Sequence, residues 1–331
     1  MSQLIKLQDF ISRYEQDIYH YSSQYVSVKH QEWSQLKRAF DAGDLSPYLI
    51  KEEMDLPVIA ELPEEGSFRK KVIRLFRKDR GAGKEAEDVS LSETEDEKTE
   101  RKKRFLRTVP ADEQELKQAF LNYFYSFQLK WAMSARDDSF THLGRYQFDE
   151  LLRFVLQRFP DNCLVLYRPV LEVKNVSVEL DVILLTPTDT WCLVFLEAED
   201  DSVFTRGEGR FWTRTHHNKA AKKVLDPLIT LNRMQWIIEQ IFTAKGISFP
   251  VRKAVICRNG YINNPNADLE GIIDKRKFTK WFDSIRHNHS TIKHLQLKAA
   301  NALLMHGSGM NRERMNKEEE LSGNHGESGS W

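Results

Sequence analysis

Apolar side chains recur every three or four positions in several stretches of the chain, which is the spacing of one face of an α-helix. This pattern predicts helices over residues 3–21, 30–41, 111–134 and 145–158. The first two form an N-terminal helical region within residues 1–60. The third, within residues 111–135, is expected to pack on the core through an apolar and aromatic stripe made by Leu116, Phe120, Phe124, Phe127 and Trp131.

The middle of the chain is richer in Val, Leu and Ile, and its apolar runs have the length of strands. These runs cover 163–173, 178–185 and 190–197, and a fourth follows at 251–257. Between the third and the fourth, Asp226 and Pro227 suit the N-cap and the first position of a helix. The order helix, three strands, helix, strand predicts a mixed α/β domain over 140–260, whose sheet starts antiparallel. Further helices are expected over 261–306.

The remaining segments are polar and charged. Residues 61–110 alternate basic, acidic and basic blocks and predict a largely disordered linker. It is either a solvated tether or an electrostatic arm for nucleic acid or another acidic partner. Residues 307–331 are rich in Gly, Ser and Asn and predict a disordered tail. The formal net charge is zero, from 49 basic and 49 acidic residues, so only local patches can attract a charged partner.

Three features bear on the compartment. No run reaches the roughly 20 apolar residues of a membrane helix. The N-terminal MSQLIKLQDF lacks the layout of a signal peptide. Cys163, Cys192 and Cys257 form no CxxC pair and are expected to be buried thiols. We therefore expect a cytoplasmic protein with no membrane partner; a homo-oligomer stays open.

Four carboxylates flank a turn at 187–189. If the turn centres on its middle residue, Glu179 lies opposite Glu197, and Asp181 and Glu199 share their face. Asp181 and Glu197 are then diagonal neighbours, about 7–8 Å apart by Cβ. Such charges repel, and a hard divalent cation, Mg²⁺ or Mn²⁺, would offset the repulsion. The alternative is a set of solvated strand-end residues, and a slip of one residue breaks the shared face.

The run from Glu179 to Glu199, ELDVILLTPTDTWCLVFLEAE, resembles the PD-(D/E)XK nuclease superfamily and, more narrowly, its nuclease-related domain (NERD) family. That family shows E-x-D at the start of one strand, a T-P turn, E-x-K at the end of the next strand, and N-P opening a helix. Here Thr186-Pro187 stands at the T-P turn and Asp226-Pro227 at the N-P position, and the resemblance covers residues 144–257. It implies a PD-(D/E)XK nuclease-like mixed sheet flanked by helices, and Mg²⁺- or Mn²⁺-dependent hydrolysis of DNA.

The resemblance also implies roles for single residues. Asp181 and Glu197 hold the metal, and an acid of the upstream helix, Asp149 or Glu150, completes its shell, so that Glu150 joins the candidate catalytic set. Glu199 stands where the family has lysine. It is then a metal ligand or a general base.

Two other outcomes of this departure stay open. A lysine from elsewhere, such as Lys219 or Lys222, could take the missing position. Otherwise the site is inactive, and the module binds nucleic acid or a protein. The upstream helix also departs from the family pattern, because Gly144 is followed by Arg145 rather than Glu.

A basic and aromatic stretch covers residues 204–223. Its cations are expected to bind the phosphate backbone of a nucleic acid, and DNA is the expected partner. The alternative is a loop that covers the sheet edge, with Phe211 and Trp212 as anchors. The candidate substrate-binding residues are Arg206, Arg210, Arg214, Lys219 and Lys222.

Overall fold

A computed structural model describes residues 1–50, 104–133, 144–174, 176–207, 209–217, 219–263 and 271–307. Most of the predicted linker and the predicted tail from residue 308 onward lie outside these residues. The chain divides into two compact units. The first unit contains residues 1–31 and the chain from Leu121 onward, and the second contains residues 32–120. The fold is mixed α/β.

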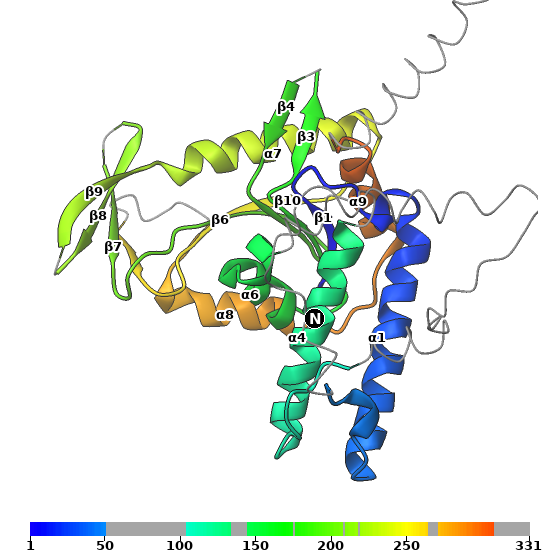
Figure 1. Cartoon of the computed structure of the whole chain (residues 1–331). Helices are drawn as coiled ribbons and strands as arrows, with labels where there is room; N and C mark the ends of the chain where they lie inside the picture. The colour runs from blue at the N-terminus through cyan, green and yellow to red at the C-terminus, as the bar shows by residue number, and fades with distance from the viewer. Residues whose placement is uncertain are drawn as a thin grey trace, which may run out of the picture. The chain divides into compact units, whose positions relative to one another are not determined.

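A six-stranded mixed sheet forms the centre of the first unit (Figure 1). Its two inner pairings, β2 with β5 and β5 with β6, are antiparallel, and the other three pairings are parallel. β2 and β5 are buried at every position, which is why they are continuous apolar runs in the sequence. The strands, in spatial order, are β1 (Gln3–Leu7), β2 (Leu164–Tyr167), β5 (Val182–Leu185), β6 (Thr190–Phe195), β10 (Val251–Ile256) and β12 (Ile272–Ile273).

Helices cover both faces of this sheet (Figure 1). On one face, α6 (Glu150–Arg158) and α8 (Lys275–Arg286) share an apolar cluster with Val182 and Leu184. On the other, α7 (Pro227–Ala244) lies against β6 and β10, and α9 (His294–Leu304) lies against α7. Asp226 caps α7, since its Oδ1 accepts a hydrogen bond of 2.9 Å from the backbone N–H of Leu228. The predicted start of that helix is confirmed.

Two smaller sheets project from the main one (Figure 1). The first pairs β3 (Val170–Val173) with β4 (Val176–Glu179). The second has the order β11-β7-β8-β9. The single strands predicted over 163–173 and 178–185 are therefore each divided into two. The members of the second sheet are β7 (Val203–Arg206), β8 (Phe211–His216), β9 (Lys219–Leu225) and β11 (Tyr261–Asn263).

The helix predicted over 3–21 is wrong for its first residues, which form β1. All five residues of β1 are buried, including Lys6. Its Nζ donates to Glu15 Oε1 at 2.6 Å and to the carbonyl of Phe10 at 2.8 Å. A parallel strand covered on both faces has no polar alternation, so its pattern could not be distinguished from a helix face. The helix α1 follows, over Ile18–Asp41.

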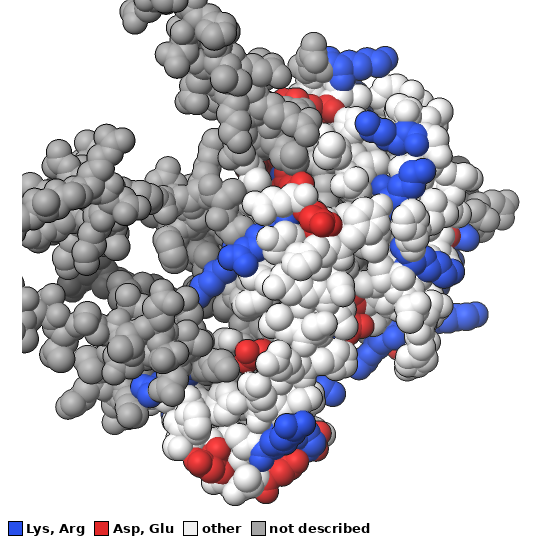
Figure 2. Space-filling view, turned by 90° about the vertical axis from the view of Figure 1, so that its right-hand side faces the viewer, with Lys and Arg blue, Asp and Glu red and all other residues white. Residues whose placement is uncertain are grey.

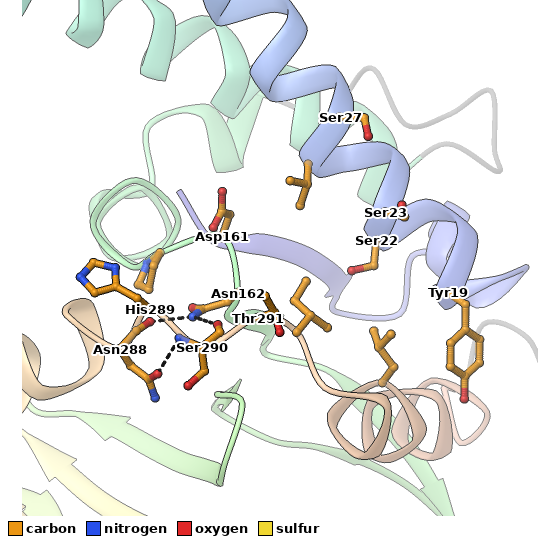
Figure 3. A pocket seen from close by; sticks show the side chains of 14 residues that line it. Tyr19, Ser22, Ser23, Ser27, Asp161, Asn162, Asn288, His289, Ser290 and Thr291 are labelled. Atoms are coloured by element: carbon orange, nitrogen blue, oxygen red, sulfur yellow. Dashed lines mark hydrogen bonds between the residues drawn. The ribbon is translucent and has the colours of Figure 1, made fainter.

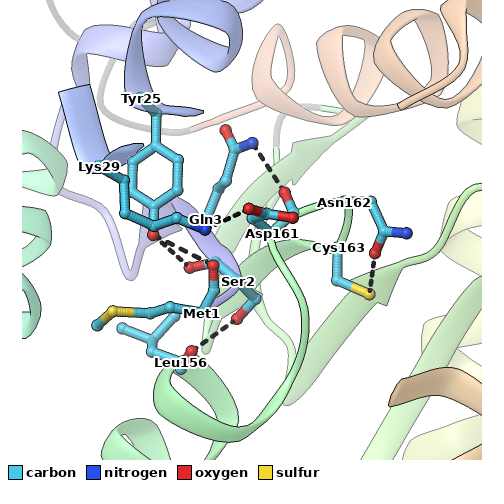
Figure 4. Close-up of polar contacts among 9 residues, drawn as sticks. All are labelled: Met1, Ser2, Gln3, Tyr25, Lys29, Leu156, Asp161, Asn162 and Cys163. Atoms are coloured by element: carbon cyan, nitrogen blue, oxygen red, sulfur yellow. Dashed lines mark hydrogen bonds and ion pairs between the residues drawn. The ribbon is translucent and has the colours of Figure 1, made fainter. Parts of the chain in front are cut away.

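Polar contacts join the N-terminal segment to the corner between α6 and β2 (Figure 4). The N–H of Ser2 donates to the carbonyl of Leu156 at 2.9 Å, and Gln3 Nε2 donates to that of Asp161 at 3.0 Å. Lys29, on α1, forms an ion pair with the side chain of Asp161. The first unit therefore extends beyond the predicted domain of residues 140–260.

The second unit contains the end of α1, the 3-10 helix η2 (Ser46–Tyr48) and the beginning of α4 (Glu113–Ala132). The rings of Trp33 and Phe120 lie 5.2 Å apart, and Lys37 Nζ lies 3.0 Å from Glu113 Oε2. Aromatic rings thus pack α1 and α4 within this unit.

Three further features concern the cysteines, the length of the helices and the charge on the surface. Cys163, Cys192 and Cys257 are free and buried, as predicted. None of the helices in the described ranges is both long and apolar enough to cross a membrane. One face of the molecule shows basic and acidic side chains interspersed among wide uncharged areas (Figure 2).

Candidate functional site

The predicted acidic residues lie at one end of the six-stranded sheet. Because β5 and β6 are antiparallel, the start of β5 lies beside the end of β6, and Val182 pairs with Leu193. Asp181 directly precedes β5, and Glu197 follows β6 by two residues. The same end receives the last residues of β2 and β10.

The predicted register of this hairpin is wrong by one residue. Ile183 pairs with Cys192, so the turn centres between Pro187 and Thr188. The N–H of Thr186 donates to the carbonyl of Asp189 at 2.8 Å and closes the turn at that position.

Glu179 does not belong to this hairpin, because it ends β4 and pairs with Val170. The expected pairing of Glu179 with Glu197, and the shared face built on it, are therefore wrong. What Asp181 and Glu197 share is the same end of the sheet, not one face of a ladder.

Glu197 is held by an arginine. Arg258, just beyond β10, contacts both carboxylate oxygens, with Nη2 2.7 Å from Oε2 and Nε hydrogen-bonded to Oε1. The guanidinium carbon of Arg258 also lies 4.1 Å from the ring centroid of Phe154. A metal ion at Glu197 has to displace this guanidinium or share the carboxylate with it.

Glu199 is held by two cations from the second sheet. Lys219 Nζ lies 2.5 Å from its Oε1, and Arg214 Nη1 lies 3.2 Å from its Oε2. The Lys219 hydrogen bond, assisted by the charge of Arg214, lowers the pKa of Glu199 to about 2. Lys219 and Lys222 were the two candidates to replace the lysine that the family has at position 199. These contacts favour Lys219, because its ammonium group lies beside Glu199.

Asp181 differs from the other two acids. It is half-buried, and within the described part of the chain it has neither a hydrogen bond nor an ion pair through its side chain. Burial raises the pKa of Asp181, although the nearby charges of Arg168 and Arg233 act to lower it. Asp181 is thus an open carboxylate at the edge of the core.

Of the two acids predicted on the upstream helix, Asp149 is attached to the sheet end. It caps α6 by accepting from the N–H of Leu152 at 2.9 Å. Its carboxylate also accepts from the hydroxyl of Tyr167, the last residue of β2, at 2.8 and 3.0 Å. Glu150 is exposed and stays a prediction.

The fit of a metal to these side chains depends on Glu197. Among the described residues, no group of three or more His, Cys, Asp or Glu side chains is positioned to hold a metal ion. Carboxylates are ligands that Mg²⁺ and Mn²⁺ accept. The residues that would hold such an ion at this sheet end are Asp181 and Glu197, and Glu197 is paired with Arg258.

The basic stretch is a sheet rather than a loop. Arg214 pairs with Phe204 on one side and with Lys222 on the other, and Arg206 pairs with Trp212. These pairings place the three cations on the same face as the buried Trp212. Lys219, which pairs with His216, belongs to this face as well.

The alternative of a loop that covers the sheet edge is wrong, because this segment forms strands. Of the two aromatic anchors expected for that loop, only one is buried. Trp212 is fully buried, whereas Phe211 is 50% exposed. Arg210 precedes β8, and its carbonyl accepts from the N–H of Asp226 at 2.9 Å. Of the cations on this face, Arg214 and Lys219 pair with Glu199, whereas Arg206 is half-buried and Lys222 is exposed.

Sequence reasoning missed Arg258 and Tyr167. Both stand at the ends of strands, Arg258 two residues beyond β10 and Tyr167 as the last residue of β2. The rule that ligand-binding residues follow the carboxyl ends of parallel strands could have found Arg258.

A hollow of about 530 Å³ lies at the opposite end of the sheet (Figure 3). Asp161 and Asn162, which line it, precede β2, whereas the acidic site follows β2. Asn162 Nδ2 donates to the carbonyls of Asn288 and Ser290, both at 2.7 Å, and so fixes the opposite wall. None of the predicted site residues lines this hollow.

Comparison with known proteins gives one short similarity. No family model matches the chain, and no solved structure matches it. A protein of Geobacillus stearothermophilus described as an RNA 2',3'-cyclic phosphodiesterase is 48% identical over 42 residues. The similarity spans 13% of this chain and 13% of that protein.

Proposed function

We propose that the first unit is a PD-(D/E)XK-type domain that hydrolyses phosphodiester bonds of DNA with Mg²⁺ or Mn²⁺. The observation that carries the proposal is the open, half-buried Asp181 at the sheet end where Glu197 and the Glu199–Lys219 pair also lie. The order α6, β2, β5, β6, α7, β10 supports it, because it is the order of elements that the sequence resemblance implies.

Each residue has a chemical role in this proposal. Asp181 and Glu197 hold the metal ion, which when bound polarises the phosphoryl group and activates water. Lys219, kept in place by Glu199, orients the attacking water and balances charge on the phosphate. The basic face with Arg206, and with the other cations of its sheet, holds the nucleic-acid backbone.

A second function is favoured by the ion pairs. Glu197 and Glu199 are already neutralised by Arg258, Arg214 and Lys219. If Glu197 does not exchange Arg258 for a metal, the same surface is a binding module for nucleic acid without hydrolysis.

The test is cleavage of end-labelled DNA and RNA oligonucleotides, single- and double-stranded, in Mg²⁺, Mn²⁺ or EDTA. We expect DNA cleavage that needs the metal and falls about 10²-fold or more in Asp181→Asn, Glu197→Gln and Lys219→Met, on the scale of general acid–base losses. Asp189→Asn is the matched control, because Asp189 lies at the opposite end of β6.

Four outcomes separate the alternatives. Cleavage of RNA but not of DNA would show that the substrate is RNA, the class of substrate in the description of the Geobacillus protein. Binding without cleavage by the wild type, with cleavage gained in Glu199→Lys, would identify an inactive binding module. Cleavage that survives the changes at Asp181 and Glu197 would show that the site is elsewhere. Loss of cleavage in Asp189→Asn as well would point to general damage.

A further inference from the structure

The cross-strand position of Arg168 is the starting point. Leu164 pairs with Leu185 in the β2–β5 ladder, and Val170 pairs with Glu179 in the β3–β4 ladder. Both ladders have one common register, and this register, continued through the break between them, brings Arg168 across from Asp181, whose carboxylate interacts with the charge of Arg168. A cation and a carboxylate thus face each other at the sheet end.

The backbone holds Arg168 in an unusual conformation. Its φ is 47°, in the left-handed region that residues other than glycine rarely adopt. Neighbouring strands fix it there, since Gln8 N–H donates to the carbonyl of Tyr167 at 3.0 Å and Leu180 N–H donates to that of Pro169 at 3.0 Å. Such strain is concentrated at functional sites.

The guanidinium of Arg168 is available for a ligand. It is half-buried, its carbon lies 5.3 Å from the ring centroid of Tyr167, and within the described ranges its side chain has no hydrogen bond or ion pair. Arg214 and Arg258, by contrast, are both paired with glutamates. A partly buried guanidinium without a partner suits phosphate, whose oxygens accept its parallel N–H donors.

Arg168 and Asp181 face each other without closing an ion pair. The carboxylate is therefore open to a metal ion, and the guanidinium is open to an anion. A phosphodiester bound between them supplies the anion, and the metal that neutralises it supplies the cation. Arg168 then binds the phosphate and Asp181 binds the metal ion, and the two residues need not form an ion pair with each other.

We propose that Arg168 is the residue that binds the reacting phosphate of the substrate and positions it beside Asp181. The proposal rests on the function proposed above. It assigns Arg168 to the non-bridging oxygens of the reacting phosphate, and Arg206 and Lys222, on the second sheet, to other phosphates of the nucleic-acid backbone.

The experiment uses the whole chain with Arg168→Gly, Arg168→Lys and Arg168→Ala. Glycine removes the guanidinium and relieves the backbone strain, so this variant is expected to fold at least as well as the wild type. Lys174→Gly is the matched control, because Lys174 also has a positive φ, 52°, and lies in the turn after β3, away from the site.

Three measurements follow on each variant: melting temperature, affinity for a DNA oligonucleotide in Ca²⁺ over a series of salt concentrations, and cleavage in Mn²⁺. Arg168→Gly should keep its melting temperature, bind DNA about 10-fold or more weakly, as for a lost charge-assisted hydrogen bond, and lower the log–log salt slope by about one. Arg168→Lys should recover part of the binding but little cleavage, since an ammonium cannot form the bidentate contact.

The outcomes distinguish this proposal from the proposed function. Unchanged binding and slope in Arg168→Gly, with cleavage intact, would overturn the role of Arg168 alone. A wild type that does not cleave, but whose DNA affinity and slope fall in Arg168→Gly, would overturn hydrolysis and support Arg168 as a phosphate-binding residue. Equal losses in Lys174→Gly would overturn the specific role, and a wild type that binds no DNA at any salt concentration would overturn both.

Discussion

Removing Arg258 should strengthen the binding of a divalent cation. In the structure, the guanidinium occupies both carboxylate oxygens of Glu197. A metal ion has to compete with it, and the positive charge also repels the ion. Arg258→Gln frees the carboxylate from the positive charge while keeping a polar side chain.

The size of the effect follows from the exposure of the pair. The side chains of Arg258 and Glu197 are 23% and 26% exposed, so solvent screens much of their attraction. We take the free energy of this ion pair as about 1 kcal/mol. This value is at the upper end for exposed pairs because the contact is bidentate. That free energy corresponds to about a fivefold change in a dissociation constant. Without metal, Arg258→Gln loses the ion pair and the contact with Phe154, so its melting temperature should fall by about 2–4 °C.

Calorimetric titration with Mn²⁺ measures the affinity. Arg252→Gln is the control, because Arg252 Nε lies 2.6 Å from Asp189 Oδ1 at the opposite end of β6 and β10, and its guanidinium carbon lies 5.8 Å from the Trp191 ring centroid. The control should lose a similar amount of stability and bind Mn²⁺ as the wild type does. If Arg258→Gln binds Mn²⁺ no more tightly than the wild type, Glu197 is not a metal ligand.

Three further predictions concern single side chains. Burial raises the pKa of Asp181, so the penalty for ionising it in the folded state appears as pH rises through the unfolded value of about 4. Asp181→Asn should therefore melt higher than the wild type at pH 7 without metal and equally below about pH 3, and an unchanged melting temperature at pH 7 would contradict this. The pKa of Glu199, about 2 beside Lys219, should rise toward its ordinary range in Lys219→Met, as NMR titration of that carboxyl would show; an unmoved titration would mean that the backbone hydrogen bond of Glu199 and the charge of Arg214 set it without Lys219. Gly260→Ala should cost about 1 kcal/mol or more, because its Cβ would lie 2.4 Å from the carbonyl oxygen of Ser202, whereas Gly144→Ala, with nothing within 4 Å, should not destabilise the fold.

The sequence alone determined those parts of the fold that depend on local burial. β5 is an uninterrupted apolar run, β6 is apolar after Thr190, and β10 ends in the apolar residues 254–256. The helix between β6 and β10 begins at its capping Asp226. The order of the strands also placed Asp181 and Glu197 at one end of a hairpin, since consecutive antiparallel strands reverse direction. These features need only the side chains of the segment itself and its nearest neighbour in sequence.

The tertiary structure decided everything that depends on distant partners. The strand β1 pairs in parallel with β2, more than 150 residues away, and is buried on both faces, so its sequence pattern lacked the alternation that identifies strands. The hairpin register depended on how Thr186 and Asp189 close the turn, and a one-residue difference moves every side chain to the other face.

The same distinction explains the site. The sequence located the carboxylates, but it could not show that Arg258 holds Glu197, that Lys219 reaches Glu199, or that Arg168 lies opposite Asp181. Each of these relations joins strands that are separate in the chain. Charge attraction acts over a few ångströms between side chains, and those distances exist only after the sheets have assembled.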